Sequence, residues 1–278
     1  MKNLSLLLLI FILGTSNMQS QNLSVMTYNI RLDVASDGEN AWPNRKDFLS
    51  SQILFYSPDI LGVQEAKPNQ MADLKESLKG YDVFGLGRDG DNKDEHSSIF
   101  YNSKKVSVEN EGTFWLSETP NEVSMGWDGA CRRICTYGLF TLLENKQKVW
   151  VFNTHLDHVG IEARLKGMQL ILKKMASFNT NNLPVVLMGD FNVEPNDPLI
   201  INLKQHMNDA KDFANITFGS NGTFNGFKFH EPVTKRIDYI MVSKSDGIEV
   251  EKHGVLSSAV DLKYPSDHFP VFMELKLK

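Results

Sequence analysis

Apolar and polar positions alternate along the chain in short blocks that are typical of an α/β protein. Several stretches are apolar and short enough to be strands. They are 23–29, 59–65, 81–86, 97–101, 135–143, 148–155, 184–190, 236–242 and 268–275. Other stretches carry apolar residues at spacings of three and four, which predicts amphipathic helices within 45–57, 68–80 and 161–175. The alternation predicts sheets that bear helices on their outer faces.

The N-terminal segment differs in composition from the rest of the chain. Lys2 precedes an apolar run from Leu4 to Leu13, followed by small and polar residues, so residues 1–20 are predicted to be a signal peptide. The run is too short to span a bilayer as a helix, and no transmembrane segment is expected. Export to the periplasm or the extracellular space follows. No Pro-, Ser- or Gly-rich linker interrupts 21–278, which predicts one domain. Within it, 111–130 is expected to be a long loop.

Composition narrows the classes of partner. The chain is 41% hydrophobic and 23% charged, with a formal net charge of −5, as in an ordinary globular protein. Such a charge disfavours a broad basic face for duplex DNA, but it permits a small or metal-bridged phosphorylated substrate. Cys131 and Cys135 lie four residues apart beside a predicted strand. That spacing is about 13 Å on a strand, too far for a disulfide, so both are predicted to be free thiols.

Carboxylates, amides and histidines stand where the predicted strands end. The residues are Asn29, Glu65, His155, Asp190, Asn192, Asp238, Asp267 and His268. Solvation alone would place Lys, Ser and Thr at such positions as often. If the strands align in packed sheets, these ends can converge on one cleft. Oxygen ligands in this number suit a hard cation such as Mg²⁺, Mn²⁺ or Ca²⁺. A cation, a carboxylate base and histidines together suit hydrolysis of a phosphate ester.

Six short motifs carry a family resemblance. In chain order they are TYNIR, LGVQE, NTHLDH, GDFNVEP, RIDYI and SDHFPV, and they span residues 23–275 almost completely. They resemble the motifs of the endonuclease/exonuclease/phosphatase superfamily, whose members have a deoxyribonuclease I-like fold. The resemblance implies a four-layered α/β/β/α sandwich and a secreted, metal-dependent phosphoesterase. The substrate class stays open between nucleic acid, a lipid head group and a small phosphate ester, and no protein partner is implied.

The resemblance also implies roles for the strand-end residues on the metal side. Glu65 matches the main Mg²⁺ ligand of the family, with Asn29 as the amide at the metal and Asp267 as a second acidic ligand. Mg²⁺ is therefore the expected cofactor, with Mn²⁺ and Ca²⁺ as alternatives.

The remaining strand-end residues match the catalytic positions of the family. Asp190 matches the aspartate that deprotonates the attacking water, and Asn192 matches an amide that holds a phosphate oxygen. His155 matches a position that contacts the phosphate and helps to protonate the leaving oxygen. His268 matches the histidine on the phosphate, and Asp238 matches the carboxylate that orients it.

Two arginines are weaker candidates for substrate binding. Arg31 lies two residues past Asn29 and faces either the cleft or a nearby acid. Of Arg132 and Arg133, one is expected at a solvated strand edge, and Arg132 is taken as the phosphate-binding candidate. An alternative function is a secreted binding protein on the same fold that has lost catalysis. The complete set of acids, amides and histidines disfavours it.

Overall fold

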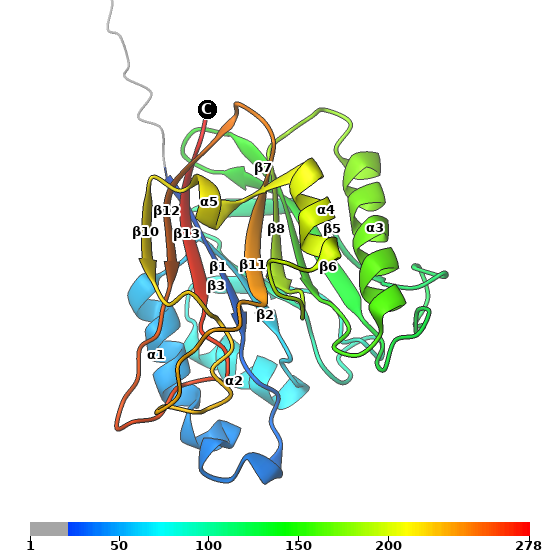
Figure 1. Cartoon of the computed structure of the whole chain (residues 1–278). Coiled ribbons are helices and arrows are strands. Elements are labelled where there is room, and N and C mark those ends of the chain that lie inside the picture. The colour runs from blue at the N-terminus through cyan, green and yellow to red at the C-terminus, as the bar shows by residue number, and fades with distance from the viewer. Residues whose placement is uncertain (1–21) are drawn as a thin grey trace, which may run out of the picture.

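The computed structural model describes residues 22–278, which form two sheets packed face to face between helices (Figure 1). The seven-stranded sheet has the spatial order β10 (Ile216–Gly219), β12 (Ile248–Val255), β13 (Val271–Leu277), β1 (Asn22–Asn29), β2 (Ile60–Gln64), β4 (Ile99–Asn102) and β3 (Tyr81–Phe84). The six-stranded sheet has the order β5 (Val106–Trp115), β6 (Ile134–Leu142), β7 (Lys148–His155), β8 (Val185–Asp190), β11 (Asp238–Ser243) and β9 (Met207–Asp209). The predicted signal peptide, 1–20, lies outside the described residues, so export stays a prediction.

Helices cover the outer face of each sheet. The helices α1 (Lys46–Tyr56) and α2 (Pro68–Ser77) pack against the seven-stranded sheet. The helices α3 (Ile161–Phe178) and α4 (Pro198–His206) pack against the six-stranded sheet. Shorter pieces complete the set: α5 (Ala210–Phe213) and the 3₁₀ turns Ala35–Asn40 and Trp42–Asn44. The predicted α/β/β/α sandwich is confirmed. Within 22–278 no helix combines the length and apolar character needed to cross a bilayer.

The central strands are buried on both faces because their side chains alternate between two cores. In β1, Val25 enters the core between the sheets, whereas Met26 and Tyr28 enter the core under α1 and α2. In β8, Met188 faces the other sheet and Leu187 faces α3 and α4. A strand with two apolar faces reads as a continuous apolar run, which is why these strands were evident in the sequence.

Two predicted boundaries are wrong. The segment 111–130 is not entirely a loop, because β5 continues to Trp115 and pairs with β6. β5 is an edge strand whose polar residues face outward, and its register shifts between Glu109 and Gly112, so it lacks a clear apolar alternation. Likewise the last strand begins at Val271 rather than at His268. The predicted free thiols Cys131 and Cys135 are confirmed.

The residues before β13 pair with a loop rather than with the sheet. The backbone N–H groups of Asn225 and Gly226 donate to the Asp267 carbonyl, and the N–H of Phe269 donates to the Thr223 carbonyl. Pro270 then separates this loop from the sheet, since proline has no N–H to give to a ladder. Asp267 and His268 are therefore held by a loop–loop contact at the end of the sandwich.

Candidate active site

Three neighbouring strands of the six-stranded sheet end with polar side chains at the same level. The pairing places His155 opposite Asp190 across β7 and β8, and Asp238 opposite Asp190 across β11 and β8. The strand register thus brings three predicted catalytic residues side by side. Residue 189 must be glycine for β8 to pass this close to β7. Its φ is +143°, and a Cβ there would lie 1.9 Å from the Thr154 carbonyl oxygen.

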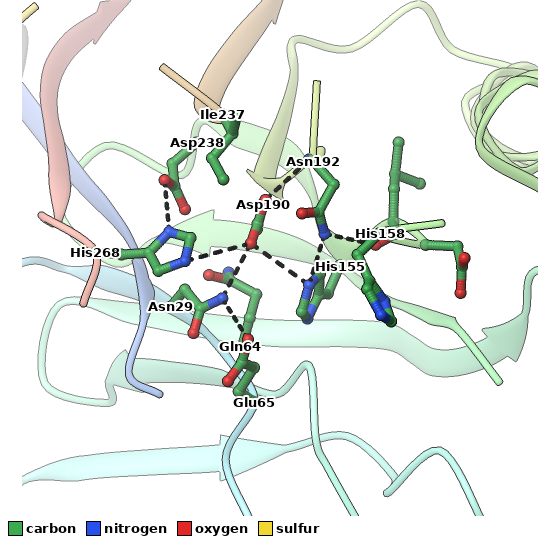
Figure 2. A network of polar contacts seen from close by, with 12 residues as sticks. Asn29, Gln64, Glu65, His155, His158, Asp190, Asn192, Ile237, Asp238 and His268 are labelled. Carbon is green, nitrogen blue, oxygen red and sulfur yellow. Dashed lines mark hydrogen bonds and ion pairs between the residues drawn. The ribbon is translucent and has the colours of Figure 1, made fainter. Parts of the chain in front are cut away.

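Asp190 is the centre of the polar network (Figure 2). Its Oδ2 accepts a hydrogen bond from Asn29 Nδ2 at 3.0 Å. The same oxygen lies 3.4 Å from His155 Nε2 and 3.8 Å from His268 Nε2. Its Oδ1 accepts the backbone N–H of Asn192 at 2.9 Å. Partners from both sheets therefore fix the carboxylate in one orientation.

Asn29 joins the carboxylates of Asp190 and Glu65. Its Nδ2 also donates to Glu65 Oε1 at 3.0 Å, while its Oδ1 accepts the backbone N–H of Arg31 at 3.1 Å. Glu65 Oε2 accepts the backbone N–H of Leu32 at 3.0 Å. Glu65 has a φ of +63°, an uncommon conformation for a residue with a side chain. Through its N–H groups Asn29 positions two carboxylates, and its role as a direct metal ligand stays a prediction.

The two histidines beside Asp190 have different partners. His268 Nδ1 lies 2.9 Å from Asp238 Oδ2, so the ring is oriented by a carboxylate as predicted. His155 Nε2 lies 3.0 Å from Asn192 Nδ2, an amide nitrogen that can only donate. His155 must therefore accept through this nitrogen, which requires a neutral ring.

Burial and neighbouring charge separate the pKa values of these groups. Burial lowers the pKa of His155 well below its usual value, and the positive charge of Arg133 adds to this. Burial would also lower the pKa of His268, but the charge and hydrogen bond of Asp238 outweigh it and raise the pKa well above the usual value. Burial first, and the charge of Asp238 second, raise the pKa of Asp190 to about 7. At neutral pH the site thus holds one charged and one neutral histidine.

A cavity of about 820 Å³ opens onto this network. Most of the predicted site residues line it, namely Arg31, Glu65, His155, Asp190, Asn192, Asp267 and His268. Two of the predicted residues lie behind the wall: Asn29 is fully buried and Asp238 is 2% exposed. These two contact the lining residues rather than the space in which a substrate would bind.

The arginine candidates are placed differently from one another. Arg31 lines the cavity, but it is paired with Asp37 at 2.9 Å, and its Nε lies 3.9 Å from Asp267 Oδ2. Arg132 is paired with Asp89 at 3.1 Å and does not line the main cavity. Arg133 does line it. The interpretation that one of the adjacent arginines is solvated is supported, but the choice of Arg132 for the cavity is not.

Acidic groups near the cavity could hold a cation. Ligand atoms of Asp190, Asp238 and His268 all lie within 4.8 Å of one another and are buried. Asp238 Oδ1 is buried with no hydrogen-bond partner among residues 22–278. Glu65 and Asp267 both line the cavity and offer further carboxylate oxygens, and the charge of Glu65 contributes, after burial, to a raised pKa of Asp267. Carboxylates this close favour a cation between them.

A buried amide layer beneath the site was not predicted. Gln64 Nε2 donates to Thr27 Oγ1 at 2.9 Å and to Asn153 Oδ1 at 2.7 Å. Asn153 Nδ2 in turn donates to the carbonyls of Val63 and Ser98, both at 3.0 Å. These bonds tie the two sheets together directly under Glu65 and His155. The only signal in the sequence was an amide inside each of two otherwise apolar strands.

The chain belongs to the Endonuclease/Exonuclease/phosphatase family, whose model matches residues 26–268. Together with the cavity and its acids and histidines, this membership defines a hydrolase of phosphate esters. The resemblance predicted from the motifs is confirmed at this level.

Individual relatives differ in how much of the chain they match. A solved mannosyl-6-phosphatase of Bacteroides thetaiotaomicron is 38% identical, covers 91% of this chain and 99% of its own, and superposes with a TM-score of 0.86. A family protein from Bacteroides vulgatus is 34% identical over 93% of this chain and all of its own, with a TM-score of 0.88.

Curated relatives match a smaller share. A probable RNA exonuclease of Saccharomyces cerevisiae is 27% identical over 64% of this chain and 39% of its own length. An uncharacterized mimivirus protein is 30% identical over 55% of this chain, which spans 60% of that protein.

Proposed function

We propose that this protein is a metal-dependent phosphatase that hydrolyses sugar phosphate monoesters with an activated water molecule. The observation that carries the proposal is the position of Asp190. Its carboxylate lies between two histidines at the wall of a cavity, with a pKa raised to about 7. A base with a pKa near neutrality can accept a proton from water and still be unprotonated in much of the population.

The residues around Asp190 divide the remaining work. His268, kept charged by Asp238, donates to a phosphate oxygen and stabilises the charge that builds up in the transition state. Asn192 lines the cavity, and its amide can hold a second phosphate oxygen when one of its N–H groups turns away from its present acceptors, His155 Nε2 and the Leu156 carbonyl. His155 is neutral, so it can protonate the leaving oxygen only after it has taken up a proton. Asp190, whose Oδ2 lies 3.4 Å from His155 Nε2, can pass on the proton that it receives from the attacking water.

Glu65 and Asp267 are the residues that would hold the divalent cation, with Mg²⁺ the first candidate and Mn²⁺ or Ca²⁺ the alternatives. Both line the cavity and both offer carboxylate oxygens. The group Asp190, Asp238 and His268 suits a cation less well, because a charged histidine has no free lone pair. When bound, the cation would neutralise charge on the phosphate.

Two observations support a small sugar phosphate as the substrate. The first is the likeness to a mannosyl-6-phosphatase over 91% of the chain. The second is the composition of the cavity lining. Of the residues within 22–278 that line the cavity, Phe224 is the only aromatic one besides the histidines, and its ring packs edge-on against His268. Proteins that bind single-stranded nucleic acid stack bases on exposed aromatic rings. Such a platform is missing from this part of the wall.

A substrate panel with Mg²⁺ tests the proposal. The panel sets mannose 6-phosphate, glucose 6-phosphate and p-nitrophenyl phosphate against bis-p-nitrophenyl phosphate and an oligonucleotide. We expect the sugar phosphates to give the highest kcat/KM, and Asp190→Asn and His268→Ala to lose about 1,000-fold or more. Cleavage of the oligonucleotide with a higher kcat/KM than the sugar phosphates would refute the proposal and indicate a nuclease. No turnover on any ester would favour the alternative of an inactive binding protein.

A further inference from the structure

One wall of the cavity carries charged residues that the proposed chemistry does not use. Arg88, Glu95, Arg133 and Arg164 all line it. Arg88 and Glu95 come from the connection between β3 and β4, whereas Arg133 precedes β6 and Arg164 lies in α3. The first three residues precede β7 in the chain, whereas α3 comes directly before β8, which carries Asp190. The four residues form a second polar surface in the same cavity.

Glu95 is held rigidly on this wall. Arg88 Nη2 lies 2.9 Å from Glu95 Oε1, and Arg88 Nε donates to Asp94 Oδ2 at 2.7 Å. Trp115 Nε1 donates to the Arg88 carbonyl at 2.7 Å, and the N–H of His96 donates to the Ala66 carbonyl at 2.8 Å. Only 12% of the Glu95 side chain is exposed, so the loop presents a fixed carboxylate and not a mobile one.

Glu95 has unused acceptor capacity. An ionised carboxylate offers about four lone-pair sites. Among residues 22–278, Arg88 is the only charged side chain within ion-pair distance of Glu95, and apart from this ion pair the Glu95 carboxylate accepts no side-chain hydrogen bond. Arg133, on the same wall, makes one good hydrogen bond, at 3.0 Å to His158, and a long one of 3.5 Å to Asp157. The wall thus presents an acceptor beside guanidinium donors.

This combination matches hydroxyl groups better than other substrate parts. A hydroxyl both donates and accepts, so it can donate to Glu95 while it accepts from Arg88 or Arg133. The arginines would attract a second phosphate, but the negative charges of Glu95 and of Glu194, which also lines the cavity, would repel it, whereas a neutral hydroxyl meets no such repulsion. Neighbouring hydroxyls on a sugar ring would meet the donors and the acceptor together.

We propose that Glu95, supported by Arg88, binds ring hydroxyls of the substrate and determines a preference for sugar phosphates over phosphate esters that lack hydroxyls. This inference rests on the proposed function, since it needs an ester whose phosphate lies at Asp190. Glu95 is a specificity-determining residue in this proposal and takes no part in the attack on phosphorus.

The test compares Glu95→Gln with wild type on mannose 6-phosphate and on p-nitrophenyl phosphate, at saturating Mg²⁺. We expect kcat/KM for the sugar phosphate to fall about 10- to 100-fold, mainly through KM, as for the loss of a charged hydrogen bond. The value for p-nitrophenyl phosphate should change less than about 3-fold. Asp94→Asn is the matched control, because it removes the same charge from the other partner of Arg88 outside the cavity. It should keep the wild-type preference.

Each of the other outcomes would overturn either the role of Glu95 or the proposed function. Equal losses on both substrates, or a raised Mg²⁺ requirement, would place Glu95 in the metal site or the chemistry. An unchanged preference would refute the inference while the phosphatase stands. The same loss in Asp94→Asn would make Arg88 the determinant. Wild type inactive on both monoesters would overturn the phosphatase proposal and the inference with it. Should Glu95→Gln fail to fold, Glu95→Asp keeps the charge but withdraws it from the cavity, and the same loss is expected.

Discussion

Asp157 allows a quantitative prediction, because a single buried carboxylate holds two segments of the cavity wall. Its Oδ1 accepts the backbone N–H groups of Val159 at 3.0 Å and Gly160 at 2.7 Å. Its Oδ2 accepts those of Ala130 and Cys131, both at 3.1 Å. Asp157→Asn keeps one oxygen for the local turn but sets an NH₂ group against the donors of the other segment. We predict a clear loss of stability.

The magnitude follows from the pKa and from the unsatisfied donors. Burial would raise the pKa of Asp157, but the N–H groups of Gly160, Ala130 and Val159 outweigh it and lower the pKa from 3.8 to about 2. That shift corresponds to at most about 2.4 kcal/mol. We take about 1–2 kcal/mol, because water in the adjacent cavity screens the charge. A donor left without an acceptor adds about 1–3 kcal/mol. The total loss is predicted to be about 2–5 kcal/mol.

Urea unfolding of wild type and Asp157→Asn at pH 7, 5, 4 and 3 measures this difference. A depressed folded-state pKa stabilises the protein above pH 3.8, and this contribution is lost as the pH falls toward 2. The difference between the two proteins should therefore be constant from pH 7 to 5 and shrink below pH 4.

Asp128→Asn is the matched control for the Asp157 series. Asp128 is an exposed acid in the loop that also contains Ala130 and Cys131. Its carboxylate accepts the N–H groups of Glu162 and Ala163 at the start of α3. The substitution should cost clearly less stability than Asp157→Asn, because solvent can replace the hydrogen bonds of an exposed helix cap. A loss below about 1 kcal/mol for Asp157→Asn, or a difference that does not shrink in acid, would refute the reasoning.

Asp238→Asn should lower kcat about 100- to 10,000-fold, since His268 loses its charged partner. NMR titration of this variant should show a lower pKa of His268, and an unchanged pKa would contradict this role of Asp238. EDTA should abolish turnover, and Mg²⁺ or Mn²⁺ should restore it; activity indifferent to chelation would exclude the metal proposal. Gly189→Ala should cost about 3 kcal/mol or more in thermal unfolding, whereas Gly80→Ala, also at positive φ but with no atom near its Cβ, should cost about 1 kcal/mol. Similar losses for both would contradict the crowding argument.

The strand ends show how far local sequence reaches. Apolar runs such as 184–190 predict strands because burial on both faces leaves no polar position inside them. A polar residue at the end of such a run is then conspicuous, which is how Asp190 and His155 were found. The edge strands β5 and β10 were missed for the opposite reason. One face or both remain in solvent, so their residues carry no strong apolar pattern.

The cavity wall that carries Arg133 and Glu95 could not be predicted from the sequence. Arg132 and Arg133 are adjacent in sequence and identical in chemistry, yet only Arg133 lines the cavity. Successive side chains on an extended chain point in opposite directions, and the register of β6 decides which one faces inward. Glu95 gave no signal either, because an acid in a polar loop is ordinary. Its pairing with Arg88 depends on the folded loop.

The α/β alternation, the family motifs and the identity of the acids, amides and histidines in the site all follow from the sequence alone. Local periodicity and side-chain chemistry are enough for these. Their contacts and charge states depend on the folded structure: Asn29 reaches Asp190 from the other sheet, and Asp238 keeps His268 charged while burial keeps His155 neutral. Those differences arise from burial and from contacts between segments that are separated in the chain, by 161 residues for Asn29 and Asp190 and by 30 for Asp238 and His268, and no local pattern contains them.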